Sequence, residues 1–185
     1  MLTEPTRFDG ALEHLVSAAE ALRAFAVPAL RKDFIVDPYQ LLEARAAGAG
    51  GVLLIVRMLS PAQLAELLAL ARGLGLFVLL EAFDAADLER THDCVAGHPA
   101  GAAPLLIGVN CRDLDTLAVA PERFETLAAA LPAGCPAVAE SGVADPGQAR
   151  RVRGLGYRLA LIGTALMAAA DPEWLLTRIL AEARA

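Results

Sequence analysis

The feature that most constrains the fold of this chain is a regular alternation of short apolar runs and helical patterns. Runs typical of buried strands occupy residues 27–32, 51–56, 76–81, 104–110, 136–140 and 158–163. A helical pattern follows each run, and the repeat of roughly 23 to 31 residues is the size of a βα unit. Strand followed by helix, repeated along the chain, predicts a parallel sheet with helices packed outside it.

The helical patterns carry recognisable start signals. Asp37 before Pro38 and Ser60 before Pro61 are typical of an N-cap followed by the first helical residue. Helices are expected at 37–48, 60–75, 84–93, 121–131, 145–156 and 171–185, and another at 11–25. If "MLTE" (1–4) is a strand that precedes the helix expected at 11–25, the chain has seven βα units.

Polar residues stand at the carboxyl ends of several of the expected strands. A doubly wound sheet would usually show a glycine-rich loop after its first strand, and none is present. A TIM barrel instead gathers its chemistry at the carboxyl ends of its strands. One such residue is ordinarily a solvated loop residue, but several on successive strands favour a functional edge in a single barrel domain, 1–185. The residues at these ends are Glu4, Lys32, Glu81, Asn110, Glu140 and Ser141.

Lys32 is the only lysine of the chain, and the other fifteen basic residues are all arginine. A GC-rich genome explains the arginines but not the retained lysine. An ammonium can lose its proton when burial or neighbours lower its pKa, whereas a guanidinium stays charged. The residue types alone single out Lys32 without assigning it a role. An ion pair with adjacent Asp33, or a surface lysine that escaped replacement, would be an ordinary explanation.

Charge and composition exclude several classes of partner. The formal net charge is −6 and the basic residues form no cluster, which argues against nucleic acid and anionic membranes. No apolar run reaches the roughly 18 residues of a membrane span, and the start "MLTEPTRF" lacks the pattern of a signal peptide. We expect a cytoplasmic location. Cys94, Cys111 and Cys135 have no metal-ligand spacing and are expected to be reduced.

Several blocks together resemble indole-3-glycerol-phosphate synthase, the TIM-barrel enzyme of tryptophan biosynthesis. They are "LTEPTRFDGALEHL", "PALRKDFIVDPYQLLEARAAGAGGVLLI", "LLEAFDAADLER", "IGVNCRDL", "AVAESGV" and "LIGTALMAAADP", and they cover nearly the whole chain. The resemblance implies a carboxy-lyase that closes an indole ring on 1-(2-carboxyphenylamino)-1-deoxyribulose 5-phosphate, releasing carbon dioxide and water. It implies a phosphorylated small-molecule substrate and no metal or organic cofactor.

The resemblance also implies roles for particular residues. Lys32 would be the general acid that protonates the substrate carbonyl, Glu81 would take part in the later proton transfer, and Asn110 would complete the catalytic group. The implied substrate-binding residues are Glu4, Phe8, Phe34, Arg112 and Glu140, and the implied phosphate-binding residues are Ser141, Gly142, Gly163 and Thr164. Without the resemblance, turn chemistry, strand capping and ordinary core aromatics would explain many of these positions.

The chain departs from the family at its start. Members carry an additional helical segment and a first strand ending in a Glu-Ser-Lys motif, and this sequence has neither. The expected fold is therefore a TIM barrel with strands 2 to 8 present and the first strand lacking. Such a sheet would have two open edges and would tend to self-associate. A catalytically silent fragment that only binds phosphate ligands or a partner chain is the alternative function, and phosphoribosylanthranilate isomerase, which lacks the "LRKDF" block, ranks lower.

Overall fold

The computed structural model describes residues 1–184 and shows an α/β fold built from six strands and the helices between them. The chain forms two compact units: Met1–Glu81 with Asp93–Leu106, and Ala82–His92 with the chain from Ile107 onward. The prediction of a single domain is not tested by this division.

The elements follow the expected alternation. The strands are β1 (Leu30–Arg31), β2 (Gly51–Ile55), β3 (Phe77–Ala82), β4 (Leu105–Asn110), β5 (Ala137–Glu140) and β6 (Leu159–Leu161). The longer helices are α2 (Leu12–Arg23), α3 (Pro38–Ala46), α4 (Pro61–Gly73), α5 (Ala85–Ala96), α7 (Pro146–Gly154) and α9 (Pro172–Arg184). The shorter ones are α1 (Pro5–Phe8), the 3₁₀ turn η1 (Val56–Met58), α6 (Arg123–Ala128) and α8 (Thr164–Ala168).

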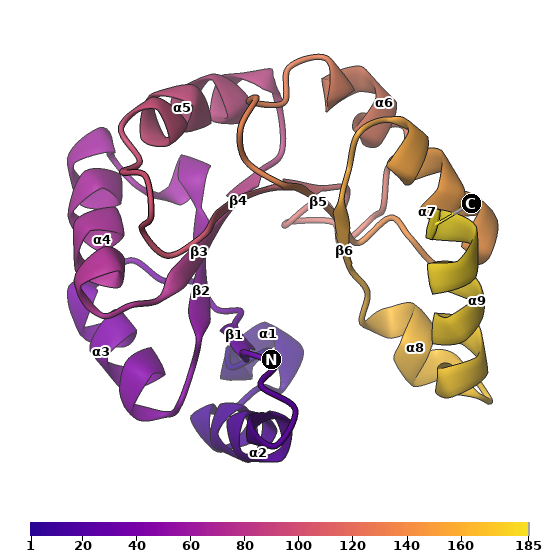
Figure 1. Cartoon of the computed structure of the whole chain (residues 1–185), viewed down its shortest axis with the longest axis horizontal. Coiled ribbons are helices and arrows are strands. Elements are labelled where there is room, and N and C mark those ends of the chain that lie inside the picture. Colours follow the sequence, from indigo (N-terminus) through magenta and orange to yellow (C-terminus); the bar gives the residue numbers. More distant parts are fainter. Residues whose placement is uncertain (185) are drawn as a thin grey trace. The chain divides into compact units, whose positions relative to one another are not determined.

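In the first unit the strands follow one another in the order β1-β2-β3, all parallel. Arg31 is the register partner of Val52, and Ile55 is the partner of Glu81. All five residues of β2 are buried, as expected for a strand covered on both faces. Helices α3 and α4 lie along one side of these strands (Figure 1).

The expected strand at "MLTE" is not a regular strand but an isolated parallel bridge between Leu2 and Lys32. Lys32 donates its backbone N–H to the Met1 carbonyl at 2.9 Å, and Thr3 donates to the Lys32 carbonyl at 3.1 Å. Pairing stops there because Glu4 is the N-cap of α1, which begins at Pro5. The number of regular strands is therefore six among residues 1–184, not seven.

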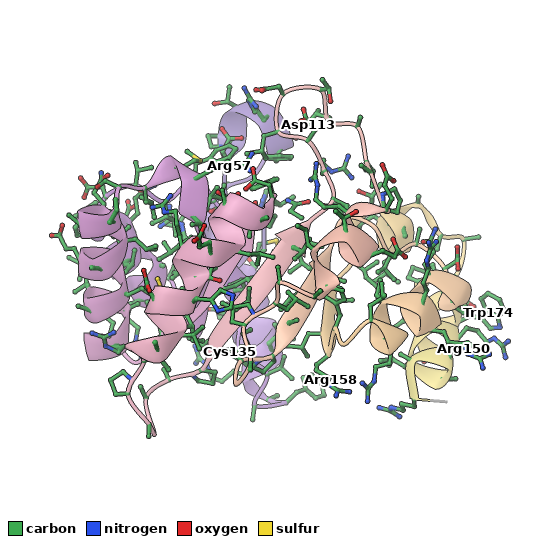
Figure 2. The ribbon with its side chains drawn as sticks, turned by 90° about the horizontal axis from the view of Figure 1, so that it is seen from above. Arg57, Asp113, Cys135, Arg150, Arg158 and Trp174 are labelled. Atoms are coloured by element: carbon green, nitrogen blue, oxygen red, sulfur yellow. The ribbon has the colours of Figure 1, made fainter. Side chains whose placement is uncertain are left out.

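In the second unit the order is β4-β5-β6, again parallel. Asn110 is the register partner of Glu140, and Glu140 is the partner of Leu161, so these carboxyl ends lie at one edge. Figure 2 shows Asp113, which follows β4, at the opposite end of this unit from Cys135 and Arg158, which precede β5 and β6. Among the described residues β6 pairs with β5 alone, and its Leu159 is 47% exposed.

The helix start signals are confirmed by capping hydrogen bonds. The Asp37 carboxylate accepts from the N–H of Tyr39 at 2.8 Å, and the Ser60 hydroxyl accepts from the N–H of Gln63 at 3.3 Å. Both caps are reciprocal, because the side-chain oxygen of the glutamine three residues later accepts from the backbone N–H of the cap residue. Local chemistry therefore fixes where α3 and α4 begin, a few residues after β1 and β2 end.

An aromatic pair fills the space beneath the turn that follows β5. The rings of Phe124 and Tyr157 meet edge to face with centroids 5.2 Å apart, and the Tyr157 hydroxyl donates to the Phe124 carbonyl at 3.2 Å. A Cβ atom added to Gly142 would lie 2.5 Å from the Phe124 ring and 3.3 Å from the Cys111 Cβ. Only glycine fits at this position without displacing the ring.

We therefore predict that Gly142→Ala lowers the free energy of unfolding by about 1–3 kcal/mol, the usual cost of overpacking a filled core. Gly163→Ala is the matched control, because a Cβ there meets no atom within 4 Å, and its effect should stay within about 0.5 kcal/mol. Urea unfolding of the three proteins measures both values. Equal stability of the two variants would contradict the packing described here.

Candidate functional site

The residues implied by the resemblance lie in two groups, one in each unit. The first unit holds Glu4, Phe8, Lys32, Phe34 and Glu81, and the second holds Asn110, Arg112, Glu140, Ser141, Gly142, Gly163 and Thr164. Within each unit the groups gather around the carboxyl ends of the strands. Parallel pairing produces this gathering, since it brings the ends of successive strands to the same edge of a sheet.

Lys32 and Glu81 form the central contact of the first group. The Lys32 Nζ donates to Glu81 Oε2 at 2.6 Å, across the intervening strand β2. The Glu81 side chain is fully buried, whereas the Lys32 side chain is 22% exposed. Glu81 Oε1 is also buried and accepts no hydrogen bond from any described residue. A buried carboxylate oxygen without a donor is costly in a purely structural ion pair and common at functional sites.

Two aromatic side chains of the first unit, Phe8 and Phe34, lie close to each other. The rings of Phe8 and Phe34 have centroids 6.4 Å apart and are tilted by 41°. Phe8 is the last residue of α1, and both carboxylate oxygens of Glu4 cap that helix by accepting from the N–H groups of Thr6 at 2.9 Å and Arg7 at 2.7 Å. The Arg7 N–H, as the largest cause, lowers the pKa of Glu4. The structure thus shows Glu4 as a helix cap, and its expected contact with substrate stays a prediction.

The residues around the end of β4 hold one another. The Asn110 side-chain oxygen accepts from the Arg112 N–H at 2.9 Å, and the Arg112 guanidinium donates to the Leu117 carbonyl at 3.0 Å. The Arg123 guanidinium, from α6, donates to the Asn110 carbonyl. Sequence reasoning missed Arg123 because it lies 13 residues beyond the strand that it anchors.

The turn after β5 has an unusual backbone. Glu140, the last residue of the strand, is fully buried, and Ser141 follows it with a positive φ of 63°. Left-handed backbone is uncommon for residues other than glycine and often marks a functional turn. Because Gly142 is held against Phe124, the "ESG" turn has a fixed conformation.

The turn after β6 lies beside it, because Glu140 pairs with Leu161. Gly163 is the N-cap of α8, and Thr164 is its first helical residue. Both are exposed, and the space that a Cβ of Gly163 would enter is open. The two turns are therefore neighbours. Gly142 in the first is closely packed, whereas Gly163 in the second borders open space.

Other chemistries find little support. Burial, as the largest cause, raises the pKa of the Cys111 thiol to about 12, so it is not a thiolate nucleophile near neutrality. Among residues 1–184 no group of three or more His, Cys, Asp or Glu side chains is arranged to hold a metal ion. No described helix combines the length and apolar character needed to cross a membrane.

Sequence reasoning also missed Arg31, which precedes Lys32, and it considered Asp33 only as an ion-pair partner of Lys32. Arg31 is buried, and its guanidinium donates to Asp33 Oδ2 at 2.9 Å. The sequence places Arg31 at the end of an apolar run, but the burial of its side chain follows only from the folded structure.

Comparison with solved structures shows the fold. The 3-hexulose-6-phosphate synthase of Salmonella typhimurium aligns with 99% of this chain and 86% of its own, with a TM-score of 0.71 and 16% identity. A thiamine phosphate pyrophosphorylase from Pyrococcus furiosus aligns with 99% of this chain and 81% of its own, with a TM-score of 0.66 and 15% identity. At these identities the likeness concerns the α/β architecture alone.

Sequence comparison goes further. The chain is 44% identical to the indole-3-glycerol phosphate synthase of Salinibacter ruber, over all of this chain and 64% of that protein. It is 42% identical to that of Laribacter hongkongensis, over 98% of this chain and 65% of that protein. The chain thus spans just under two thirds of the length of these relatives. The family model described as indole-3-glycerol phosphate synthase matches residues 1–179, and the chain belongs to this family.

Proposed function

We propose that this chain carries the indole-3-glycerol phosphate synthase reaction of tryptophan biosynthesis. The reaction is the decarboxylating and dehydrating ring closure of 1-(2-carboxyphenylamino)-1-deoxyribulose 5-phosphate. Family membership supplies the reaction, and the contact of 2.6 Å between Lys32 and buried Glu81 is the observation that supports it in this chain. The proposed substrate is a phosphorylated small molecule, the proposed compartment is the cytoplasm, and the proposed chemistry uses side chains alone.

Lys32 is the proposed general acid. Its partly exposed ammonium can donate a proton to a substrate carbonyl, while Glu81, fully buried behind it, holds the ammonium in place. Glu81 Oε1 accepts no hydrogen bond from a described residue, so it is free to take up a proton in the later dehydration. Asn110, in the second unit, is fixed by its contacts with Arg112 and Arg123 and is also a proposed catalytic residue.

The remaining residues bind the substrate. Phe8 and Phe34 offer apolar ring faces for an anthranilate group, and Glu4 supports Phe8 by capping α1. Arg112 is a guanidinium suited to a carboxylate, and its present contact with the Leu117 carbonyl is one that substrate would replace or share. Glu140 is the proposed carboxylate partner for polar groups of the substrate.

The turns after β5 and β6 are the proposed phosphate site. Backbone N–H groups at glycine turns, together with the hydroxyls of Ser141 and Thr164, suit a dianionic phosphate. Gly142 fixes one turn by its close packing, and Gly163 leaves room for an oxyanion to approach the other. In TIM barrels phosphate commonly binds at the loops after strands seven and eight, and β5 and β6 would be those strands if this chain carries strands 2 to 8 of the family barrel.

We predict that Lys32→Arg reduces turnover of the carboxyphenylamino substrate by about 10²- to 10⁴-fold, the usual contribution of general acid catalysis. The guanidinium keeps the positive charge beside Glu81 but cannot release its proton. Steady-state assays on the chain supplied with the N-terminal segment of a longer relative, with thermal unfolding of each variant, separate chemistry from stability. Arg45→Lys is the control for an arginine–lysine exchange elsewhere, and a Lys32→Arg protein with most of its turnover would remove the proposed role.

The phosphate site gives a second prediction. Gly163→Ala should weaken the binding of inorganic phosphate at least about tenfold while leaving the unliganded stability nearly unchanged, since its Cβ enters the space proposed for the anion. Isothermal titration measures the affinity. Gly73→Ala is the control, because its Cβ also meets open space but lies at the end of α4. Unchanged phosphate affinity in Gly163→Ala would exclude this turn from the site.

The edge of β6 gives a third prediction. Among the described residues only β5 pairs with β6, so its other side and the exposed Leu159 can pair with another chain. We therefore expect the 185-residue chain to self-associate and to turn over little substrate by itself. Addition of the N-terminal segment of a longer relative, fused or as a separate peptide, should restore both a monomer and turnover. Size-exclusion chromatography with light scattering and substrate assays provide the readouts. A monodisperse and fully active monomer of the 185-residue chain would contradict this expectation.

A further inference from the structure

A network of buried polar side chains is built around Arg31 and Asp33, the two residues that flank Lys32, and the proposed reaction does not use it. Its centre is the guanidinium of Arg31, whose side chain is only 7% exposed. Arg31 Nη2 and Nε donate to Asp33 Oδ2 at 2.9 and 3.3 Å, and Nη1 donates to the Gln40 carbonyl at 2.8 Å. Asp33 is buried to a similar degree, at 10% exposure. A buried arginine with these contacts is too constrained to be a surface residue that happens to precede Lys32.

The network joins three segments of the first unit. Thr3, from the segment that bridges to Lys32, donates its hydroxyl to Asp33 Oδ2 at 2.7 Å, and Asp33 Oδ1 accepts the N–H of Phe34 at 2.8 Å. Arg31 also reaches Glu43 of α3 at 3.4 Å. The start of the chain, the loop after β1 and helix α3 are therefore tied together through one guanidinium and one carboxylate.

The alternation of side chains along an extended segment relates this network to Lys32. Arg31 and Asp33 contact each other and Arg31 contacts α3, while Lys32 between them contacts Glu81 of β3. Successive residues of an extended strand point to opposite faces, so fixing Arg31 on one face of β1 fixes the direction of Lys32 on the other. The planar fork of arginine is suited to this task because it holds two oxygens in a set geometry.

We propose that Arg31, acting through Asp33, is a positioning residue that holds the Lys32 ammonium against Glu81. It touches neither substrate nor reacting atoms, and its effect passes through the backbone of residues 31–33. This inference rests on the proposed function for its catalytic meaning, but the positioning of Lys32 can be measured without turnover.

The single lysine of the chain makes that measurement direct. Protein grown with lysine labelled with ¹³C at Cε gives NMR signals from Lys32 alone. In the unsubstituted protein the two Hε protons should have distinct chemical shifts, because the ammonium is held in one place. Glu81→Gln removes the charge of the carboxylate that the Lys32 Nζ contacts and defines the reference signal for loss of this ion pair, in which the two shifts should lie closer together.

The test variant is Arg31→Met with Asp33→Asn, which removes one positive and one negative charge together. We expect its Lys32 signal to move at least half of the way toward that of Glu81→Gln. In the synthase assay kcat should fall by about 10- to 100-fold, as for a misplaced catalytic group, with KM changed less than about twofold. Arg150→Met with Glu182→Gln is the matched control, because it removes an exposed ion pair with 3.9 Å between Nη1 and Oε2, and it should leave the Lys32 signal unchanged.

The outcomes separate the two claims. A folded test variant with an unchanged Lys32 signal would overturn the positioning role. Where that variant does not fold, Thr3→Val removes only the hydroxyl of the network, and it should shift the signal in the same direction by a smaller amount; an unchanged signal there would also overturn the role. A displaced signal in a chain that has no synthase turnover even with the N-terminal segment would support the positioning role and reject the proposed function.

Discussion

The short contact between Lys32 and Glu81 depends on how parallel strands are connected. Each βα unit returns the chain to the same end of the sheet, so residues far apart in sequence meet where their strands finish. In the first unit this brings together two residues 49 positions apart, and in the second unit it places the "ESG" turn beside the turn at Gly163. The helix caps at Asp37 and Ser60 contribute by starting the return helices soon after the strands end.

Burial of charge around Lys32 is organised as two linked pairs. Removing a charge from water is costly unless a partner and hydrogen bonds replace the water. Glu81 meets this cost through the Lys32 ammonium, and Asp33 meets it through Arg31, Thr3 and the N–H of Phe34. One oxygen, Glu81 Oε1, is left without a donor among the described residues. On the side of β1 that faces α3, the charged groups have hydrogen-bond partners. On the side where Lys32 points, Glu81 Oε1 lacks a hydrogen-bond donor within residues 1–184, and the proposed substrate would supply one.

The alternation of strands and helices could be predicted from sequence because it rests on local signals. Apolar runs and caps such as Asp37 before Pro38 and Ser60 before Pro61 act within a few residues. The prediction of a regular strand at 1–4 was wrong, because the sequence pattern did not reveal that the Glu4 side chain caps α1 and ends the pairing. The roles of Arg31, Asp33 and Arg123 depend on contacts made only after folding, and no pattern of one sequence indicates them.

A crystal structure with an unreactive substrate analogue, whose keto group is reduced to an alcohol, would test the central claim most directly. The account predicts that the oxygen replacing the keto group lies about 2.6–3.2 Å from the Lys32 Nζ, within hydrogen-bond reach of a general acid, while Glu81 stays paired with Lys32. A bound analogue whose corresponding oxygen contacts another side chain, with Lys32 directed away from it, would contradict the account.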